Sequence, residues 1–363
     1  MNSNRLSKYF LLACLLSALF ACSKTKKQQS VFKPGPVDTI PEGKYKNPVF
    51  EPILADPAVI KDTSTKTFYA YGTEDDWGDG KGDHLVAIVK STNLKDWQYI
   101  NDAFTQKPNW KANGNIWAPD VDHINGKYYM YYAYSIWADP NPGIGLAIAD
   151  KPQGPFEDKG KLFLSSEIGT ANAIDPFYIE DGGKKYLFFG SYSSQPTNGI
   201  WGAELSADGT SVLFNTKFRI AAGDFEGTMI HKRGKYYYFF GSKNNCCNGA
   251  ASVYQVRVGR SETLTGPYLD KDGKALTSWG NGSLLIEHND RFAGPGHNAR
   301  IFTDDNGTDW FIYHAIDKLN PIAPSGANRR ALMLDRITWE NDWPIIKNGT
   351  PSITLQDAPV FKK

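Results

Sequence analysis

Short apolar and aromatic runs alternate with turn-forming dipeptides over most of this chain. Continuous runs occupy residues 128–134, 186–190 and 236–241, and their shortness and aromatic content favour strands over buried helices. Turn dipeptides such as Asn125-Gly126 and Arg233-Gly234 lie between apolar runs, as hairpin turns do. Further strands are predicted at residues 85–90, 145–149, 199–204, 252–259 and 331–338. Amphipathic helical patterns are almost absent, so the pattern predicts an all-β fold.

A polar opening residue, a tight turn and an aromatic strand recur together five times. The segments begin at Asp56, Ala118, Asp175, Glu226 and His297, and their starts are 62, 57, 51 and 71 residues apart. A supersecondary unit repeated about every 50 residues is typical of propellers. No linker rich in Pro, Gly or Ser divides residues 47–363. We therefore predict one catalytic domain over residues 47–363, a five-bladed β-propeller of four-stranded antiparallel blades.

The five opening residues are expected to face the propeller axis. The first aromatic of the following strand comes 10 to 13 residues later in each segment, and the variation falls in the turns. This register predicts three carboxylates at matching positions (Asp56, Asp175 and Glu226) and a histidine, His297, in the fifth segment. In the second segment Ala118 takes the position, and Asp120 lies two residues further along the same strand face.

The composition narrows the class of ligand. Aromatic residues make up 13% of the chain, and the formal net charge is only +1. Dispersed basic residues do not predict a surface for nucleic acid, so we expect no nucleic-acid partner. Tyr and Trp suit sites where flat apolar rings meet polar ligands, and neutral carbohydrate fits this balance.

Residues 1–22 resemble a targeting segment rather than part of the fold. Arg5 and Lys8 form a positive region, and an apolar stretch from Phe10 to Phe20 follows, which is short for a membrane span. Leu19-Phe20-Ala21-Cys22 resembles the lipobox of bacterial lipoproteins. We expect lipidation at Cys22, a polar tether over residues 23–46, and a monomer anchored in the outer membrane or facing the periplasm.

Two cysteines remain for the mature domain, because Cys14 leaves with the signal and Cys22 carries lipid. Cys246 and Cys247 are adjacent, in an exported protein where disulfides persist. Two cysteines alone do not make a zinc site. A vicinal disulfide is the favoured interpretation, and two free thiols are the alternative.

Acidic groups that converge on a pocket lined with aromatic rings indicate glycoside hydrolysis. One carboxylic acid protonates the leaving oxygen, and one carboxylate activates water or attacks directly. A third acid nearby raises the pKa of the proton donor by like-charge repulsion. From the residues alone, the trio is Asp56, Asp175 and Glu226, with the acid and the base left unassigned.

The order of five short motifs over about residues 47–346 is similar to glycoside hydrolase family 43, whose members are inverting five-bladed propellers. The motifs are Ala55-Asp56-Pro57, Trp117-Ala118-Pro119-Asp120-Val121, Asn172-Ala173-Ile174-Asp175-Pro176, Glu226-Gly227 and Gly294-Pro295-Gly296-His297-Asn298. The resemblance implies that Asp56 is the general base, Glu226 the general acid, and Asp175 the residue that tunes and orients that acid. We expect the chemistry to need no cofactor. The resemblance also implies a structural calcium ion near His297, held mostly through water, since calcium prefers oxygen ligands.

Within that family, the segment Asn244–Gly249 with its Cys246-Cys247 pair is similar to endo-acting α-1,5-L-arabinanases. We expect cleavage of arabinan or a related pentose polysaccharide from plant cell walls. Predicted substrate-binding residues are Trp77, Trp117, Asp120, Asn172, Cys246, Cys247 and Arg300, with Trp137 and His314 as further candidates.

The sequence has three alternatives to an endo-acting arabinanase, which it supports unequally. Departures from the arabinanase pattern at Thr228, Ala299 and residues 193–198 leave open an exo-acting α-L-arabinofuranosidase or β-xylosidase. A glycan-binding propeller without catalysis is a different class, and binding alone does not need all three carboxylates. A fructan-cleaving propeller lacks support, because the Asn-Asp-Pro-Asn-Gly opening of those enzymes is absent.

Overall fold

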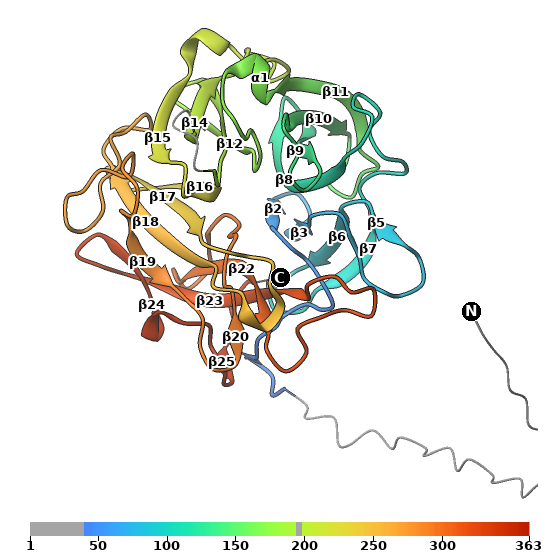
Figure 1. Cartoon of the computed structure of the whole chain (residues 1–363). Coiled ribbons are helices and arrows are strands. Elements are labelled where there is room, and N and C mark those ends of the chain that lie inside the picture. The colour runs from blue at the N-terminus through green and yellow to red at the C-terminus, as the bar shows by residue number, and fades with distance from the viewer. Residues whose placement is uncertain (1–39, 194–197, 363) are drawn as a thin grey trace, which may run out of the picture. The chain divides into compact units, whose positions relative to one another are not determined.

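Five β-sheets form a ring in the computed structural model, which describes residues 40–193 and 198–362 (Figure 1). Four sheets have four antiparallel strands each, and the fifth has five. The predicted five-bladed β-propeller is therefore confirmed, with one extra strand in the last blade. The predicted signal segment, Cys22 and residues 23–39 of the tether lie outside the described residues.

The strands of each blade follow one another in the chain, and in blades one to four the first strand lies nearest the centre (Figure 1). Blade one contains β2 (Ala58–Asp62), β3 (Thr67–Tyr71), β6 (Ala87–Ser91) and β7 (Gln98–Asp102). Blade two contains β8 (Asn115–Ile124), β9 (Lys127–Ser135), β10 (Gly143–Ala149) and β11 (Glu157–Leu164). Blade three contains β12 (Phe177–Asp181), β13 (Lys184–Phe189), β14 (Gly199–Glu204) and β15 (Phe218–Ala222).

Blade four contains β16 (Glu226–Arg233), β17 (Tyr236–Lys243), β18 (Gln255–Ser261) and β19 (Ser283–Ile286). Blade five contains β20 (Phe292–Ala293), β21 (Phe302–Thr303), β22 (Asp309–Asp317), β23 (Arg330–Glu340) and β24 (Trp343–Ile346). Outside the blades lie β4 (Asp75–Asp76) paired with β5 (Asp83–His84), the helix α1 (Ser165–Ile168), and the 3₁₀ turns η1 (Phe214–Thr216), η2 (Gly249–Ala251) and η3 (Lys347–Gly349). The strand predicted at 85–90 begins later, as β6, because Val86 has a φ of 65° that interrupts an extended run.

The hydrophobic core lies between adjacent blades, in four clusters of buried side chains. Tyr131 of blade two stacks on Tyr178 of blade three with ring centroids 5.7 Å apart. Phe240 of blade four packs against Phe311 of blade five at 6.1 Å. The large aromatic share of the chain is therefore used mainly to join twisted sheets, where flat rings bury much area.

The chain before blade one runs beside blade five. A two-stranded sheet joins β1 (Lys44–Tyr45) to β25 (Gln356–Asp357), and the buried Tyr45 donates a hydrogen bond to the carbonyl of Leu334 at 2.9 Å. The folded domain thus includes Lys44 and Tyr45, which the sequence assigned to the tether. The predicted boundary at residue 47 was late because a two-residue strand carries no periodic signal.

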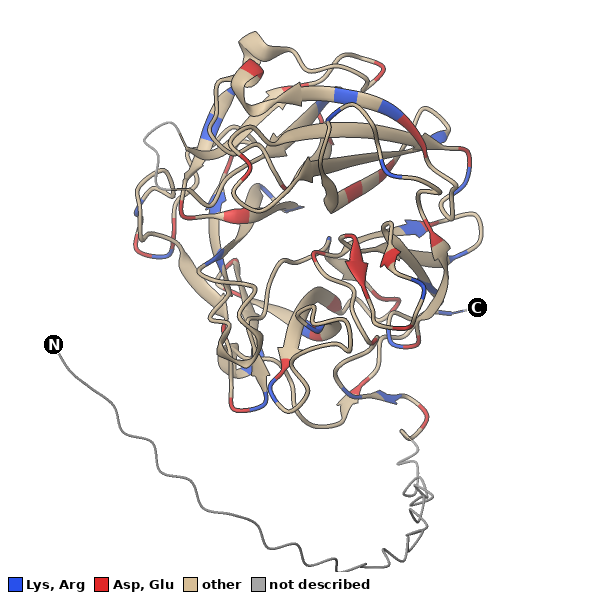
Figure 2. Cartoon of the chain, turned by 45° about the vertical axis from the view of Figure 1, so that its right-hand side comes forward, with Lys and Arg blue, Asp and Glu red and all other residues tan. Residues whose placement is uncertain are grey.

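Charged residues are interspersed over the fold (Figure 2). Segments of both signs are scattered over the loops and strands, which agrees with the net charge of +1. Within the described residues, none of the helices has the length and apolar character needed to cross a membrane.

Candidate active site

The inner strands of blades two and four have a break in their pairing near the start. In blade two the register of β8 with β9 shifts between Trp117 and Asp120, and in blade four that of β16 with β17 shifts between Glu226 and Met229. A residue with a positive φ lies at the matching place in four blades, two residues before regular pairing starts or resumes, with values of 50° at Asp56, 41° at Ala118, 52° at Asp175 and 62° at Gly227. Such bulges redirect a side chain away from the regular pleat, and they are common beside active sites.

The break places Glu226 differently from the other two carboxylates. The counterpart of Asp56 and Asp175 in blade four is Gly227, so the prediction that all three acids are in register was wrong by one residue. Counting residues between motifs cannot detect a bulge, which adds a residue to one strand without changing its partner. Glu226 is still close to the other two acids: the charge of Asp56 raises its pKa, and the next residue, Gly227, donates its backbone N–H to Asp175.

Asp56 is held as a carboxylate by basic and polar neighbours. Arg330 donates from one Nη1 to both carboxylate oxygens at 3.0 and 2.9 Å, and Thr73 donates to Oδ2 at 2.7 Å. The backbone N–H of Asp56 donates to Nδ1 of His314 at 3.0 Å. Burial by itself raises the pKa of Asp56, but Arg330, the two nearby histidines and Thr73 outweigh it and hold the pKa well below its ordinary value.

The pKa values of Glu226 and Asp175 are raised, in contrast to that of Asp56. Burial is the main cause of the raised pKa of Glu226, and the charge of Asp56 raises it further, against a hydrogen bond from Tyr254. Burial also raises the pKa of Asp175, as do the charges of Glu226 and Asp56. Oδ2 of Asp175 accepts the backbone N–H of Gly227 at 2.9 Å, which ties it to the residue after Glu226. The site therefore favours the ionised form of Asp56 and the protonated forms of Asp175 and Glu226.

His297, the residue predicted for the fifth position, lies beside Asp56. It is 9% exposed, and its Nδ1 is 3.8 Å from Oδ1 of Asp56. Nearby, the buried Thr228 Oγ1 and Asn298 Oδ1 have no hydrogen-bond partner among the described residues. Across residues 40–193 and 198–362, no three or more His, Cys, Asp or Glu side chains are grouped so that they could hold a metal ion. Because calcium takes six to eight oxygen ligands, an ion at His297 would be held mainly through water, and it stays a prediction.

Arg300 and Asp120, both predicted to bind substrate, bind each other instead. The Arg300 guanidinium pairs with both carboxylate oxygens of Asp120 and donates to the carbonyl of Tyr178 at 2.8 Å. Oδ2 of Asp120 also accepts the N–H of Tyr178 at 2.7 Å. This arrangement links the inner strands of blades two, three and five. The sequence could not distinguish such a brace from a sugar contact, because both use charged residues on the axial face.

The predicted sugar-stacking tryptophans have two different environments. Trp77 is only 7% exposed and stacks on His84 with centroids 4.0 Å apart, so it belongs to the core and its assignment to substrate was wrong. Trp117 lies 5.6 Å from Trp137, which is 75% exposed. Asn172 donates its side-chain amide to the carbonyl of Ser191, beside blade three. Trp117 and Asn172 stay predictions as sugar contacts.

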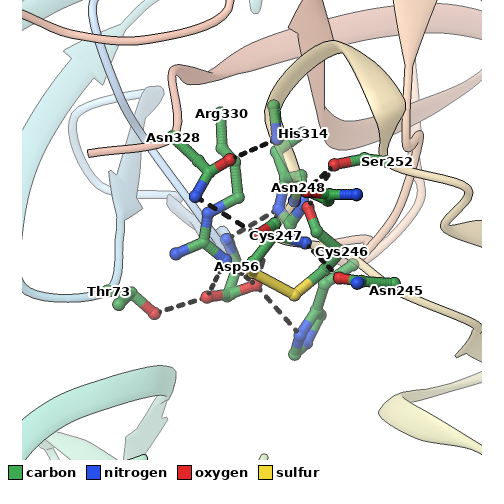
Figure 3. The surroundings of a disulfide bond; sticks show 12 residues. Asp56, Thr73, Asn245, Cys246, Cys247, Asn248, Ser252, His314, Asn328 and Arg330 are labelled. Carbon is green, nitrogen blue, oxygen red and sulfur yellow. Dashed lines mark hydrogen bonds and ion pairs between the residues drawn. A yellow bond between two sulfur atoms is a disulfide. The ribbon is translucent and has the colours of Figure 1, made fainter. Parts of the chain in front are cut away.

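Cys246 and Cys247 form the favoured vicinal disulfide (Figure 3). It lies in the loop between β17 and β18, and its surroundings include Asp56, Arg330 and His314 (Figure 3). The Cys246-Cys247 pair, which is distant from Asp56 in the sequence, thus lies near Asp56 in the fold.

Three residues that support the carboxylates were missed. Thr73 and Arg330 bind Asp56, and Tyr254 hydrogen-bonds to Glu226 while its ring stacks on His314 with centroids 5.9 Å apart. Tyr254 and Arg330 lie outside the five repeated segments, and Thr73 is the last residue of the first, after its aromatic strand. Only the folding of distant loops onto the axis identifies them.

Comparison with known proteins agrees with this geometry. The family model for glycosyl hydrolases family 43 matches residues 45–344. The chain is 32% identical over 307 residues to an extracellular endo-α-(1→5)-L-arabinanase of Bacillus subtilis, which covers 80% of this chain and 87% of that protein. It is also 32% identical over 295 residues to an extracellular exo-α-(1→5)-L-arabinofuranosidase of Cellvibrio japonicus, covering 72% and 78%.

Among solved structures, the fold is similar to a Cellvibrio cellulosa α-L-arabinanase complexed with arabinohexaose. The TM-score is 0.69 at 29% identity, and the match covers 82% of this chain and 96% of that one. A family match over most of the chain, together with the confirmed propeller, settles the question that the motifs raised. This chain belongs to glycosyl hydrolases family 43.

Proposed function

We propose that this protein is an inverting hydrolase of α-1,5-L-arabinan in which Asp56 is the general base and Glu226 the general acid. The observation that carries the proposal is the opposite displacement of two carboxyl pKa values in one pocket. A base must be ionised and an acid protonated at the same pH, and this environment favours that pair of states. Asp175 tunes and orients the acid through its repulsion of Glu226 and its hydrogen bond to Gly227.

The reaction follows from these roles. Glu226 donates its proton to the glycosidic oxygen as the bond to the anomeric carbon breaks. Asp56 accepts a proton from the water whose oxygen attacks that carbon from the opposite face, which inverts its configuration. The charge on Arg330 keeps Asp56 ionised until it accepts this proton, and a later exchange with solvent restores both groups.

A polymeric substrate is supported by the exposed aromatic pair. Trp117 on β8 and Trp137 after β9 place two indole rings 5.6 Å apart, with Trp137 open to solvent. Such rings stack on the apolar faces of sugars. We propose cleavage within arabinan chains, the action of the B. subtilis relative, which is an endo-arabinanase. The equally similar C. japonicus relative favours exo action as the second candidate.

Product analysis separates these functions. The protein is incubated with linear α-1,5-arabinan, and with aryl arabinofuranoside and aryl xyloside, and the products are followed over time. Mixed short oligosaccharides early in the reaction support endo cleavage, whereas monosaccharide alone indicates exo action. Turnover of the xyloside alone would point to a β-xylosidase. Measurable arabinan binding without turnover of any substrate would overturn the proposal of an enzyme and would favour a glycan-binding propeller.

The acid assignment has its own test. We expect Glu226→Gln to lower kcat on arabinan by roughly 10²–10⁴-fold, since a positioned general acid contributes about that much. The loss should be smaller on an aryl glycoside, whose leaving group needs less protonation. Glu262→Gln is the matched control, because Glu262 is exposed and pairs only with Lys235 on the surface. Full activity of Glu226→Gln on arabinan would remove the assignment.

We also propose that the protein is exported and anchored through lipid on Cys22, as the lipobox indicates. Both curated relatives described above are extracellular. Expression of the full chain and a Cys22→Ser variant in a bacterial host tests the anchor. The native chain should fractionate with membranes and release a lipidated peptide on mass analysis, and the variant should not. Equal fractionation of both would contradict the anchor.

A further inference from the structure

The backbone of Asp56, the proposed general base, has a conformation that needs support. Its φ is 50°, in the left-handed region, which residues other than glycine adopt at a steric cost. The next residue is Pro57, whose ring restricts the backbone of Asp56 further. Such a conformation persists only where the surrounding contacts hold it. Those contacts therefore decide where the carboxylate of Asp56 lies.

His314 supplies one of these contacts from blade five (Figure 3). Its Nδ1 accepts the backbone N–H of Asp56 at 3.0 Å. The side chain is fully buried in β22, whose backbone pairs with Leu332 at this point, and the N–H of Gly296 donates to the His314 carbonyl at 3.0 Å. The ring of Tyr254 stacks on the imidazole with an interplanar angle of 11°. The acceptor is thus fixed by its strand and by a second ring.

The direction of this hydrogen bond specifies the form of the imidazole. Because the N–H of Asp56 is the donor, Nδ1 must keep its lone pair, and the neutral ring then has its proton on Nε2. Burial, Arg330 and His297 favour the neutral form, since they lower the pKa of His314 well below its ordinary value against the charge of Asp56. A protonated ring would add a positive charge near the carboxylate, but it would lose the acceptor for the N–H.

The stability of the core does not explain a histidine at this position. Nε2 of His314 is buried and has no hydrogen-bond partner among the described residues. A buried polar atom without a partner destabilises a fold, and an apolar side chain of similar size would avoid that cost. The favourable polar contact of the ring is the one that Nδ1 makes with Asp56.

We propose that His314 is a positioning residue for the general base, whose Nδ1 accepts the N–H of Asp56 and so fixes the left-handed backbone that directs the carboxylate. Arg330 and Thr73 then bind that carboxylate. The inference rests on the proposed role of Asp56. It gives His314 a contact inside the protein, in place of the substrate contact that the sequence suggested.

Two substitutions separate the acceptor from the bulk of the ring. His314→Asn keeps an oxygen acceptor near the place of Nδ1, whereas His314→Leu keeps a side chain of similar size without one. We expect His314→Leu to lower kcat on arabinan by roughly 10–100-fold, because misplacing a catalytic group by about 1 Å costs up to about that much. His314→Asn should stay within about fivefold of the native kcat, since the N–H of Asp56 keeps a partner.

Binding and a control variant show whether the loss is specific. The Kd for arabinohexaose, measured by calorimetry in a Glu226→Gln background, should change by less than about twofold in either variant, because the ring does not touch the sugar. His231→Leu is the matched control. His231 stacks on Trp339 and lies toward the far end of β16 from Glu226, so its loss should leave kcat nearly unchanged.

NMR of the histidine ring nitrogens tests the native protein directly, and it remains decisive if His314→Leu does not fold. Protonated and unprotonated ring nitrogens have distinct chemical shifts, and the signals of His314 are assigned by their loss in His314→Asn. We expect a protonated Nε2 and an unprotonated Nδ1 throughout the pH range of activity.

The outcomes separate this inference from the proposed function. A protonated Nδ1 in the native protein overturns the inference, as do equal losses of kcat in the folded Leu and Asn variants. Weaker binding of arabinohexaose with an unchanged kcat also overturns it, and would make His314 a substrate contact. Failure of the native protein to cleave arabinan would refute the proposed function, while the NMR signals would still show whether His314 accepts the N–H of Asp56.

Discussion

Arg330 is the residue whose removal should change catalysis in the most specific way. Its Nη1 lies 2.9–3.0 Å from both oxygens of Asp56. Two unit charges about 3 Å apart interact by roughly 5 kcal/mol at an effective dielectric constant of about 20, which corresponds to roughly 4 pKa units. Solvent and relaxation reduce this, and carboxylates beside arginine in proteins are shifted by about 1–3 units.

The sign of the effect follows from the role of a base. Asp56 must be ionised to accept a proton, so activity falls as pH drops through its pKa. The pKa is held low by Arg330, His314, His297 and Thr73 against burial. We expect Arg330→Met to move the acid limb of kcat/KM upward by about 1–3 pH units, and Arg330→Lys to move it less because a cation remains.

The assay is the pH profile of kcat/KM on an aryl arabinofuranoside, with stability checked at each pH. Arg329→Met is the matched control, since Arg329 pairs with Glu51 at 3.2 Å and does not contact Asp56. It should leave the limb in place. A folded, active Arg330→Met variant with an unchanged acid limb would refute the reasoning that this ion pair keeps the base ionised.

Three further predictions concern the acid, the axial brace and the bulge. Asp175→Asn should lower the pKa of Glu226, now about 7, and move the alkaline limb of the profile down by about 1 unit, because one negative neighbour is lost; an upward shift would contradict this. Arg300→Met should destabilise the fold by about 3–5 kcal/mol in urea unfolding, because it strands a buried carboxylate, whereas Arg291→Met at an exposed pair should cost under about 1 kcal/mol; equal costs would refute the brace. Gly227→Ala should cost about 1–3 kcal/mol and reduce kcat, since its φ is 62° and a Cβ would lie 3.0 Å from His297; unchanged stability and rate would show that the bulge tolerates a side chain.

The strands and the blade number could be predicted because their signals are local. Aromatic runs such as residues 236–241 and turns such as Arg233-Gly234 specify a hairpin within about twenty residues, and the structure has that hairpin as β16 and β17. The two errors in the predicted strand bounds also have local causes. Val86 breaks an apolar run through its backbone conformation, and β1 is too short to show periodicity.

The site was predicted as residues but not as geometry. Asp56 and Asp175 have matching positive φ angles just before β2 and β12, whereas in blade four that backbone conformation falls on Gly227, one residue after Glu226. Residue counts cannot show this offset, because the bulge of blade four leaves no trace in them. The charge on Arg300 was visible, but its partner, 180 residues away, was not. The sequence pattern of a charged residue on an axial face is the same whether its side chain binds a sugar or pairs with another charged side chain.

By itself, the sequence determined the all-β class, the fivefold repeat, the family and the acidic residues available for catalysis, since these depend on side-chain chemistry and short-range periodicity. Only the tertiary structure decided their protonation tendencies. Arg330, Tyr254 and the disulfide come from loops of other blades, and a pKa depends on charges and burial within a few ångströms in space. Closing the ring brings those loops to one axis, and this makes one carboxyl a base and another an acid.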